Sequence, residues 1–310
     1  MAVNNNHQKE GDFVDAIMFS GQGAQKAGMG KNFYDQFAIS RQVFEEASDA
    51  LGLDIAKLCF EDADKQLSLT QFAQPALVTA AMAAYRVYEQ EGGEAGLLMG
   101  LSLGEYTALA AAGVLDFDQI VKLVHKRGLL MAEYAKPGGM VAVMNLCDET
   151  VNAICLSARD EGFVAPANFN TPGQVVISGE KAALDFCIDK VKNVYKGKAL
   201  PLKVAGPFHT PLMDEAAAKL KEEAMEIVAK PAKLPIISNV TADVLTYEDL
   251  SQHLEKHMIS PVYWATSVSK AANMGAKRFI EMGVGETLVN FVKKIDDSWE
   301  TFPLSVENLK

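Results

Sequence analysis

Hydrophobic residues along this chain form two kinds of run, short continuous ones and longer ones spaced at helical intervals. The runs at 13–19 and 97–99 each lead into a glycine-rich segment, as buried parallel strands that end in turns do. The segment that starts at Asp118 has the clearest helical stripe, made of Ile120, Val121, Val124, Arg127, Gly128 and Met131. Such alternation of strand and helix predicts an α/β fold with a parallel sheet.

Proline and glycine mark where several helices begin and end. Pro75 is expected to open a helix over 76–90, because proline in the first turn forfeits no hydrogen bond that the helix needs. Gly113 is expected to end an Ala-rich helix over 105–112. A further helix is predicted over 211–229, and Gly283 and Gly285 precede a last one over 286–295.

The spacing of elements changes between Gly139 and Val204. Shorter segments there predict the order βαββαβ, with strands at 140–144, 163–167, 174–178 and 199–204 and helices at 149–159 and 181–194. That order is ferredoxin-like and is complete as a two-layer unit. We therefore expect a small domain of residues 138–206 inserted into a large one of residues 13–137 and 207–310, after a disordered leader at 1–12.

Composition and charge exclude several classes of protein. The chain has 310 residues, 49% of them hydrophobic, and a net charge of −11, which disfavours nucleic acid and acidic membranes as partners. No apolar run is long enough to span a bilayer and the first residues are polar, so a cytoplasmic protein is expected. The four cysteines lack metal-site spacing, so neither a metal nor a disulfide framework is expected.

One local basic segment departs from this acidic balance. Six lysines and two acids lie from Lys181 to Lys203. A solvated helix face explains this run, and so does an interface with an acidic partner.

The segment Gly100-Leu101-Ser102-Leu103-Gly104 carries the strongest chemical signal. A serine with glycines two positions away on either side, between a strand and a helix, predicts a nucleophile elbow, because side chains at those glycines would obstruct the approach of strand and helix. The helix that follows would aim its first N–H groups at an oxyanion. The alternative is a purely structural turn.

A serine nucleophile needs a base, and a buried charge needs a partner. Of the five histidines, His209 lies in a rigid segment, Gly-Pro-Phe-His-Thr-Pro, that leads into a helix, so it is the candidate base. The alternative is that His209 only caps or packs that turn. Arg127 lies on the apolar stripe of its helix, where it would meet an internal carboxylate or the anionic end of a ligand, unless it extends to solvent.

Taken together, the motifs resemble the malonyl-CoA:acyl carrier protein transacylases and the acyltransferase domains of fatty-acid and polyketide synthases. The shared segments are FSGQGAQ (19–25), QPAL (74–77), GLSLGEY (100–106), KRGLLM (126–131), GPFHTPLM (206–213), SNVTA (238–242), SPVYW (260–264) and GVGETL (283–288). The resemblance implies an α/β-hydrolase-like large domain with a ferredoxin-like insertion. It also implies transfer of malonyl from malonyl-CoA, by a ping-pong reaction through a seryl ester, to the phosphopantetheine thiol of acyl carrier protein, supplying extender units for fatty-acid synthesis without a cofactor.

The resemblance also implies a role for each site residue. The nucleophile would be Ser102, with His209 as its base in a dyad, Arg127 as the clamp for the malonyl carboxylate, and the main-chain N–H groups of Gln22 and Leu103 as the oxyanion hole. The main-chain carbonyl of His257 would orient the base, so loss of its side chain should matter little. The acyl pocket is expected to contain Leu101, Met131 and Phe208, the last crowding an α-methyl group.

Three positions depart from the family's pattern, and some alternatives stay open. Leu101 replaces a common histidine, Ser20 a common proline and His257 a common glutamine, and the first of these removes a polar contact near the substrate that bears on acyl selectivity. The carrier would meet the Lys181 to Lys203 segment.

The nearest alternatives are a free-standing acyltransferase or an editing acyl hydrolase of a polyketide pathway. An ordinary Ser-His-Asp esterase and a non-catalytic carrier-binding subunit are more distant alternatives.

Overall fold

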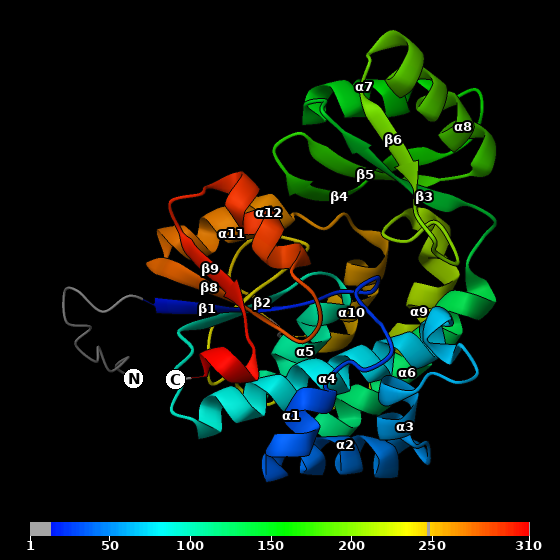
Figure 1. The fold of residues 1–310 in the computed structure, drawn as a ribbon. Coiled ribbons are helices and arrows are strands. Elements are labelled where there is room, and N and C mark those ends of the chain that lie inside the picture. Colours follow the sequence, from blue (N-terminus) through cyan, green and yellow to red (C-terminus); the bar gives the residue numbers. More distant parts are fainter. Residues whose placement is uncertain (1–13, 247–248, 310) are drawn as a thin grey trace.

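The core of the protein is a five-stranded parallel sheet (Figure 1). The computed structural model describes residues 14–246 and 249–309, so the expected leader lies outside the described residues. The strand order is β7-β2-β1-β8-β9, and every neighbouring pair is parallel. The strands are β1 (Val14–Phe19), β2 (Leu97–Gly100), β7 (Ile236–Ile237), β8 (Ala276–Met282) and β9 (Glu300–Pro303).

Helices bury both faces of this sheet. Along β1, Ile17 and Phe19 face one hydrophobic cluster, whereas Ala16 and Met18 face another. Both faces of the strand are therefore apolar, which is why it reads as a continuous run in the sequence. The larger cluster is covered by α1 (Lys31–Gln36), α2 (Ala38–Leu51), α3 (Ile55–Phe60), α4 (Thr70–Gln90), α5 (Leu103–Ala111), α6 (Phe117–Tyr134), α9 (Asp214–Ala224) and α10 (Leu250–Ile259), and the smaller one by α11 (Trp264–Asn273) and α12 (Thr287–Ile295).

A separate antiparallel sheet, ordered β4-β5-β3-β6, forms the small unit at the top of Figure 1. Its strands are β3 (Gly139–Met144), β4 (Val164–Thr171), β5 (Gln174–Gly179) and β6 (Lys198–Pro201), and its helices are α7 (Asp148–Ser157) and α8 (Lys181–Asp189), which continues as a π-helical turn over Lys190–Val194. The predicted βαββαβ order is confirmed. Val141 and Ile177 face the helices of this unit, whereas Met140, Ala142 and Val176 belong to the core cluster of the large sheet.

Several predicted helix boundaries were wrong, and Pro75 shows why. Helix α4 begins at Thr70, so Pro75 lies inside it instead of opening it. A proline there cannot donate to the carbonyl of Gln71, four residues before it. The ring of His125, on α6, donates its Nδ1 proton to that carbonyl at 2.8 Å. A tertiary contact thus satisfies the acceptor, which no local pattern around Pro75 reveals.

Two other helices also differ from their predicted bounds. Helix α6 begins one residue early, at Phe117, because Asp116 and Gln119 form a capping box ahead of it. The helix predicted over 211–229 is a short 3₁₀ turn at Pro211–Met213 followed by α9, which ends at Ala224. Within the described ranges, no helix is long and apolar enough to cross a membrane.

Candidate active site

Ser102 lies at the tip of a tight turn between β2 and α5. Its φ of 51° is in the left-handed region, which a non-glycine residue enters only when its surroundings hold it there. A Cβ on Gly100 would come within 2.0 Å of the main chain of Gly104, and a Cβ on Gly104 within 2.0 Å of the carbonyl oxygen of Phe19. The predicted elbow and the reason for its two glycines are confirmed.

The hydroxyl of Ser102 is in contact with the imidazole of His209. Ser102 Oγ lies 2.7 Å from His209 Nε2, although the two residues are 107 positions apart in the chain. His209 Nδ1 lies 3.1 Å from the carbonyl oxygen of Ser260. A carbonyl only accepts, so Nδ1 carries the proton and the lone pair of Nε2 faces the serine. This is the arrangement of a base ready to take the hydroxyl proton.

The carbonyl that mainly orients His209 comes from a different residue than the one predicted. We expected it from His257, but the 3.1 Å hydrogen bond goes to Ser260, and the main chain of His257 adds only a weaker contribution to the pKa of His209. Helix α10 ends at Ile259, and Ser260 adopts an extended conformation that turns its carbonyl out of the helix. Ser260, the residue just past the helix, is therefore the main acceptor for His209 Nδ1.

His209 is buried, and its surroundings favour the neutral imidazole. Desolvation and the positive charge of Arg127 lower its pKa to about 4, against the opposing effect of the main-chain acceptors. Above that pH the ring is therefore uncharged and able to accept a proton. Within the described residues no hydrogen bond or ion pair joins a carboxylate to His209, which agrees with a dyad.

Arg127 is buried beside this pair, and no carboxylate among the described residues pairs with it. One Nη donates to Gln74 Oε1 at 2.9 Å, and the guanidinium lies over the ring of Tyr106 at 5.2 Å. Its Nε has no hydrogen-bond partner among the described residues, and burial lowers its pKa. A buried cation with a free donor in a cavity wall is suited to the carboxylate of a ligand.

A cavity of about 250 Å³ joins these groups. Ser102, His209 and Arg127 line it together with Gln22 and the three predicted pocket residues, Leu101, Met131 and Phe208. Its far wall comes from the small unit, where Met140, Ala142 and Val176 are apolar and Asn168, Asn170 and Gln174 are polar. The cavity therefore lies between the carboxyl ends of the parallel strands and the small sheet, as ligand sites in α/β proteins commonly do.

The two main-chain N–H groups expected to hold an oxyanion are free to do so. Gln22 follows β1 and Leu103 is the first residue of α5, and neither main-chain N–H has an acceptor in the described part of the chain. The side chain of Gln22 donates to Thr70 Oγ1 at 3.3 Å, which holds the residue at the cavity wall.

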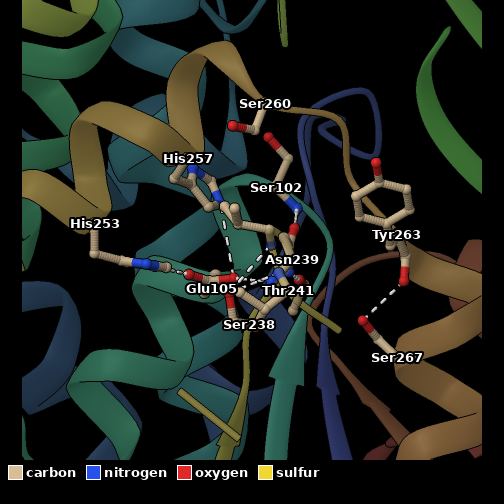
Figure 2. A network of polar contacts seen from close by, with 12 residues as sticks. Ser102, Glu105, Ser238, Asn239, Thr241, His253, His257, Ser260, Tyr263 and Ser267 are labelled. Carbon is tan, nitrogen blue, oxygen red and sulfur yellow. Dashed lines mark hydrogen bonds and ion pairs between the residues drawn. The ribbon is translucent and has the colours of Figure 1, made fainter. Parts of the chain in front are cut away.

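A buried polar network beneath the elbow was missed in the sequence (Figure 2). Asn239, after β7, accepts from Ser102 N at 2.6 Å and donates to the carbonyl of Gly100 at 2.6 Å. Glu105 accepts from Asn239 N at 2.6 Å, and its other oxygen lies 2.5 Å from His253 Nε2. The available signals were an acid, Glu105, in an otherwise Ala-rich helix and the shared segment SNVTA (238–242), which contains Asn239. Neither signal reveals that the two residues meet, because their contact depends on the fold.

Comparisons with known proteins identify the family. A family model described as "Acyl transferase domain" matches residues 17–303. Malonyl CoA-acyl carrier protein transacylases from Bacillus subtilis and Escherichia coli are each 39% identical, covering 94% and 91% of this chain and 93% of their own length.

Solved structures agree at the level of the whole fold. The malonyl CoA-acyl carrier protein transacylase of Clostridium perfringens superposes with a TM-score of 0.91 at 39% identity, over 94% of this chain and 93% of the other. A malonyl-transacylase solved in complex with its type II PKS acyl-carrier protein superposes with a TM-score of 0.92 at 35% identity, over 96% and 97%. With its elbow serine, facing histidine and matching length, the chain belongs to the acyl transferase domain family.

Proposed function

We propose that this protein transfers the malonyl group of malonyl-CoA to the phosphopantetheine thiol of acyl carrier protein. The single observation that carries the proposal is the juxtaposition, in one cavity, of the Ser102–His209 pair with a buried arginine that no carboxylate in the described part of the chain pairs with. The pair supports acyl transfer and the arginine selects an acyl group with a free carboxylate. The names of the relatives agree with this substrate and this carrier.

The first half-reaction acylates the enzyme. His209 Nε2 takes the proton of Ser102 Oγ while the oxygen attacks the thioester carbonyl of malonyl-CoA. The carbonyl oxygen becomes an oxyanion, to which the main-chain N–H groups of Gln22 and Leu103 would donate. When the tetrahedral intermediate collapses, the C–S bond breaks and the CoA sulfur receives the proton from His209. The products are free CoA and malonyl-Ser102.

The second half-reaction runs the same steps with the carrier thiol. His209 accepts the thiol proton, the sulfur attacks the ester carbonyl, and Ser102 leaves with the proton restored to its oxygen. Arg127 holds the malonyl carboxylate throughout, which fixes the ester for attack. Phe208, buried in the cavity wall, would crowd an α-methyl group and so favour malonyl over methylmalonyl.

The proposed reaction also suggests a pathway and a location. We infer that the protein supplies extender units for fatty-acid synthesis and that it acts in the cytoplasm. Its small domain is proposed to comprise residues 138–206. The similarity to a transacylase solved with a type II PKS carrier keeps a polyketide pathway as the second candidate. The rates with a fatty-acid carrier and with a polyketide carrier, measured side by side, distinguish the two.

The test is covalent labelling read by intact mass. Incubation with malonyl-CoA should add one malonyl group, and Ser102→Ala should abolish the adduct. Methylmalonyl-CoA and acetyl-CoA should label more slowly, and Arg127→Ala should reduce malonyl labelling more than acetyl labelling. A malonyl adduct that persists in Ser102→Ala, or wild-type labelling by acetyl-CoA alone, would refute the proposal.

A further inference from the structure

We propose that Glu105, through Asn239 and His253, is a positioning residue that holds the nucleophile and its base in register. The inference rests on the proposed dyad of Ser102 and His209 and adds to it a buried carboxylate that touches neither the substrate nor the reacting atoms. Figure 2 shows this carboxylate at the centre of the network, with Asn239 beside it and His253 and His257 on the helix α10.

Asn239 holds the strained elbow from below. Its Oδ1 accepts from Ser102 N at 2.6 Å, and its Nδ2 donates to the carbonyl of Gly100 at 2.6 Å. The amide thus spans the residues through which the chain leaves β2 and enters the left-handed conformation of Ser102. A strained conformation of this kind persists only where surrounding contacts hold it.

Glu105 determines the position of Asn239. The carboxylate lies in the first turn of α5, 1% exposed, and its Oε2 accepts from the main-chain N–H of Asn239 at 2.6 Å. The carbonyl of Asn239 accepts from Tyr263 N at 3.0 Å, so the residue is held on both sides. Movement of the carboxylate would therefore move the amide that supports Ser102.

The other oxygen of Glu105 reaches the helix that positions the base. Glu105 Oε1 lies 2.5 Å from Nε2 of His253, on α10, and Oε2 lies 3.8 Å from Nε2 of His257 on the next turn. The ring of His257 packs edge-on against that of His209, with centroids 5.9 Å apart. Ser260 directly follows the last residue of the same helix, and its carbonyl accepts from His209 Nδ1.

One carboxylate therefore joins two separate supports. Through Asn239 it fixes the main chain of the nucleophile, and through α10 it fixes the carbonyl and the ring that orient the base. A Ser–His contact needs both partners placed to within a fraction of an ångström. In the proposed dyad no acid binds the histidine directly. Glu105 instead positions both the serine and the histidine, through Asn239 and helix α10.

The test measures rate, binding and stability separately. Glu105→Gln and Asn239→Ala should each lower kcat for malonyl transfer by about tenfold or more, with KM for malonyl-CoA changed by less than about threefold, because Arg127 and the pocket walls are unchanged. Inactivation by phenylmethylsulfonyl fluoride, which reports Ser102 reactivity without malonyl binding, should slow in parallel. The double variant should be about as slow as Asn239→Ala alone, since the two residues act as one unit.

Asp15→Asn is the matched control for loss of a buried carboxylate. Asp15 is 5% exposed and binds Tyr88 and Arg278 at the opposite end of the sheet. It should lower the melting temperature and leave kcat unchanged. If Glu105→Gln does not fold, His253→Phe, at the solvent edge of the network, replaces it with the same expected loss in kcat.

Two results would overturn the inference. The first is a kcat within about twofold of wild type in folded Glu105→Gln, or in His253→Phe if that variant has replaced it. The second is a loss of kcat/KM that comes from a higher KM with kcat unchanged. Rescue supplies a further check: Asn239→Asp keeps the acceptor for Ser102 N and should retain more activity than Asn239→Ala. Failure of the proposed function is seen elsewhere, in Ser102→Ala that still forms the malonyl adduct.

Discussion

His209 carries the clearest quantitative expectation at the scale of single residues. Its pKa is lowered to about 4 by burial and by Arg127, so the neutral form should persist well below the ordinary histidine range. We expect the rate of inactivation by phenylmethylsulfonyl fluoride, a reagent without a titrating group, to stay level from pH 8 to about 5 and to fall around pH 4. Circular dichroism at each pH separates this loss from unfolding.

The same shift has a defined sign for stability. Because the folded pKa lies below the unfolded one, the unfolded chain binds more protons between about pH 4 and 6.5, and the free energy of unfolding should fall as the pH drops through that window. Arg127→Met removes a charge that lowers the pKa, so it should move the kinetic midpoint upward. A wild-type midpoint near 6.5 would contradict the burial effect.

Residues with a local signal could be predicted from the sequence, and those placed by other elements could not. Ser102 was found from its glycines, and Arg127 from its position on an apolar stripe. Ser260, Asn239 and His253 come from segments more than 130 positions after the elbow, and their roles exist only once β7 and α10 lie beside β2. A main-chain carbonyl, moreover, leaves no trace in the identity of its residue.

At the scale of elements, the elbow makes a prediction about glycine. Gly100→Ala and Gly104→Ala each place a Cβ about 2.0 Å from main-chain atoms, which cannot rotate away. We expect each to lower the free energy of unfolding by about 1–3 kcal/mol and to reduce acylation of Ser102. Gly139→Ala is the control, because its Cβ would meet nothing closer than 3.8 Å. Urea denaturation measures all three, and equal stability of the elbow variants and the control would contradict this account.

The proline inside α4 gives a second element-scale prediction. His125→Phe keeps the ring beside Phe72 and removes the donor to Gln71 O, so it should destabilise the protein by about 1 kcal/mol. In a Pro75→Ala background the new main-chain N–H reaches the same carbonyl, and His125→Phe should then cost less. A double-mutant cycle measured by thermal unfolding gives the coupling; a value of zero would mean that the two donors do not share the acceptor.

Strands and helices could be predicted where a strand is apolar on both faces, or where short strands and helices alternate regularly. The β1 run and the βαββαβ order of the small unit were recovered, because strand length and alternation are local properties. Helix ends were predicted less well: the bounds of α4 depend on a distant side chain, and α9 is preceded by a 3₁₀ turn. The start of α6 had a local signal, the capping box of Asp116 and Gln119, which the helical stripe alone does not include.

At the scale of the whole molecule, the small unit both closes the acyl cavity and carries a basic surface. Leu202 lines the cavity, and Lys203 and Val204 lie with Gln22 around a neighbouring hollow. From there the exposed lysines 192, 196 and 198 continue outward along the π-helical turn and the edge strand β6, among exposed Val194, Tyr195 and Leu200. In a chain of net charge −11, this apolar and basic surface suits an acidic carrier whose thiol must reach Ser102.

Charge reversal on this surface should affect one substrate and not the other. We expect Lys190→Glu with Lys196→Glu to raise KM for the carrier several-fold, more at low salt than at high salt, while KM for malonyl-CoA and kcat stay level. Lys57→Glu with Lys233→Glu makes the same change in net charge on exposed positions of the large domain and should leave both constants unchanged. Malonyl-CoA reacts in the first half-reaction and the carrier in the second, and both react at Ser102. A rise in both KM values would therefore indicate a distorted cavity instead of a lost docking contact. Unchanged carrier kinetics in the first pair would exclude docking at these lysines and would direct the carrier to another rim of the cavity.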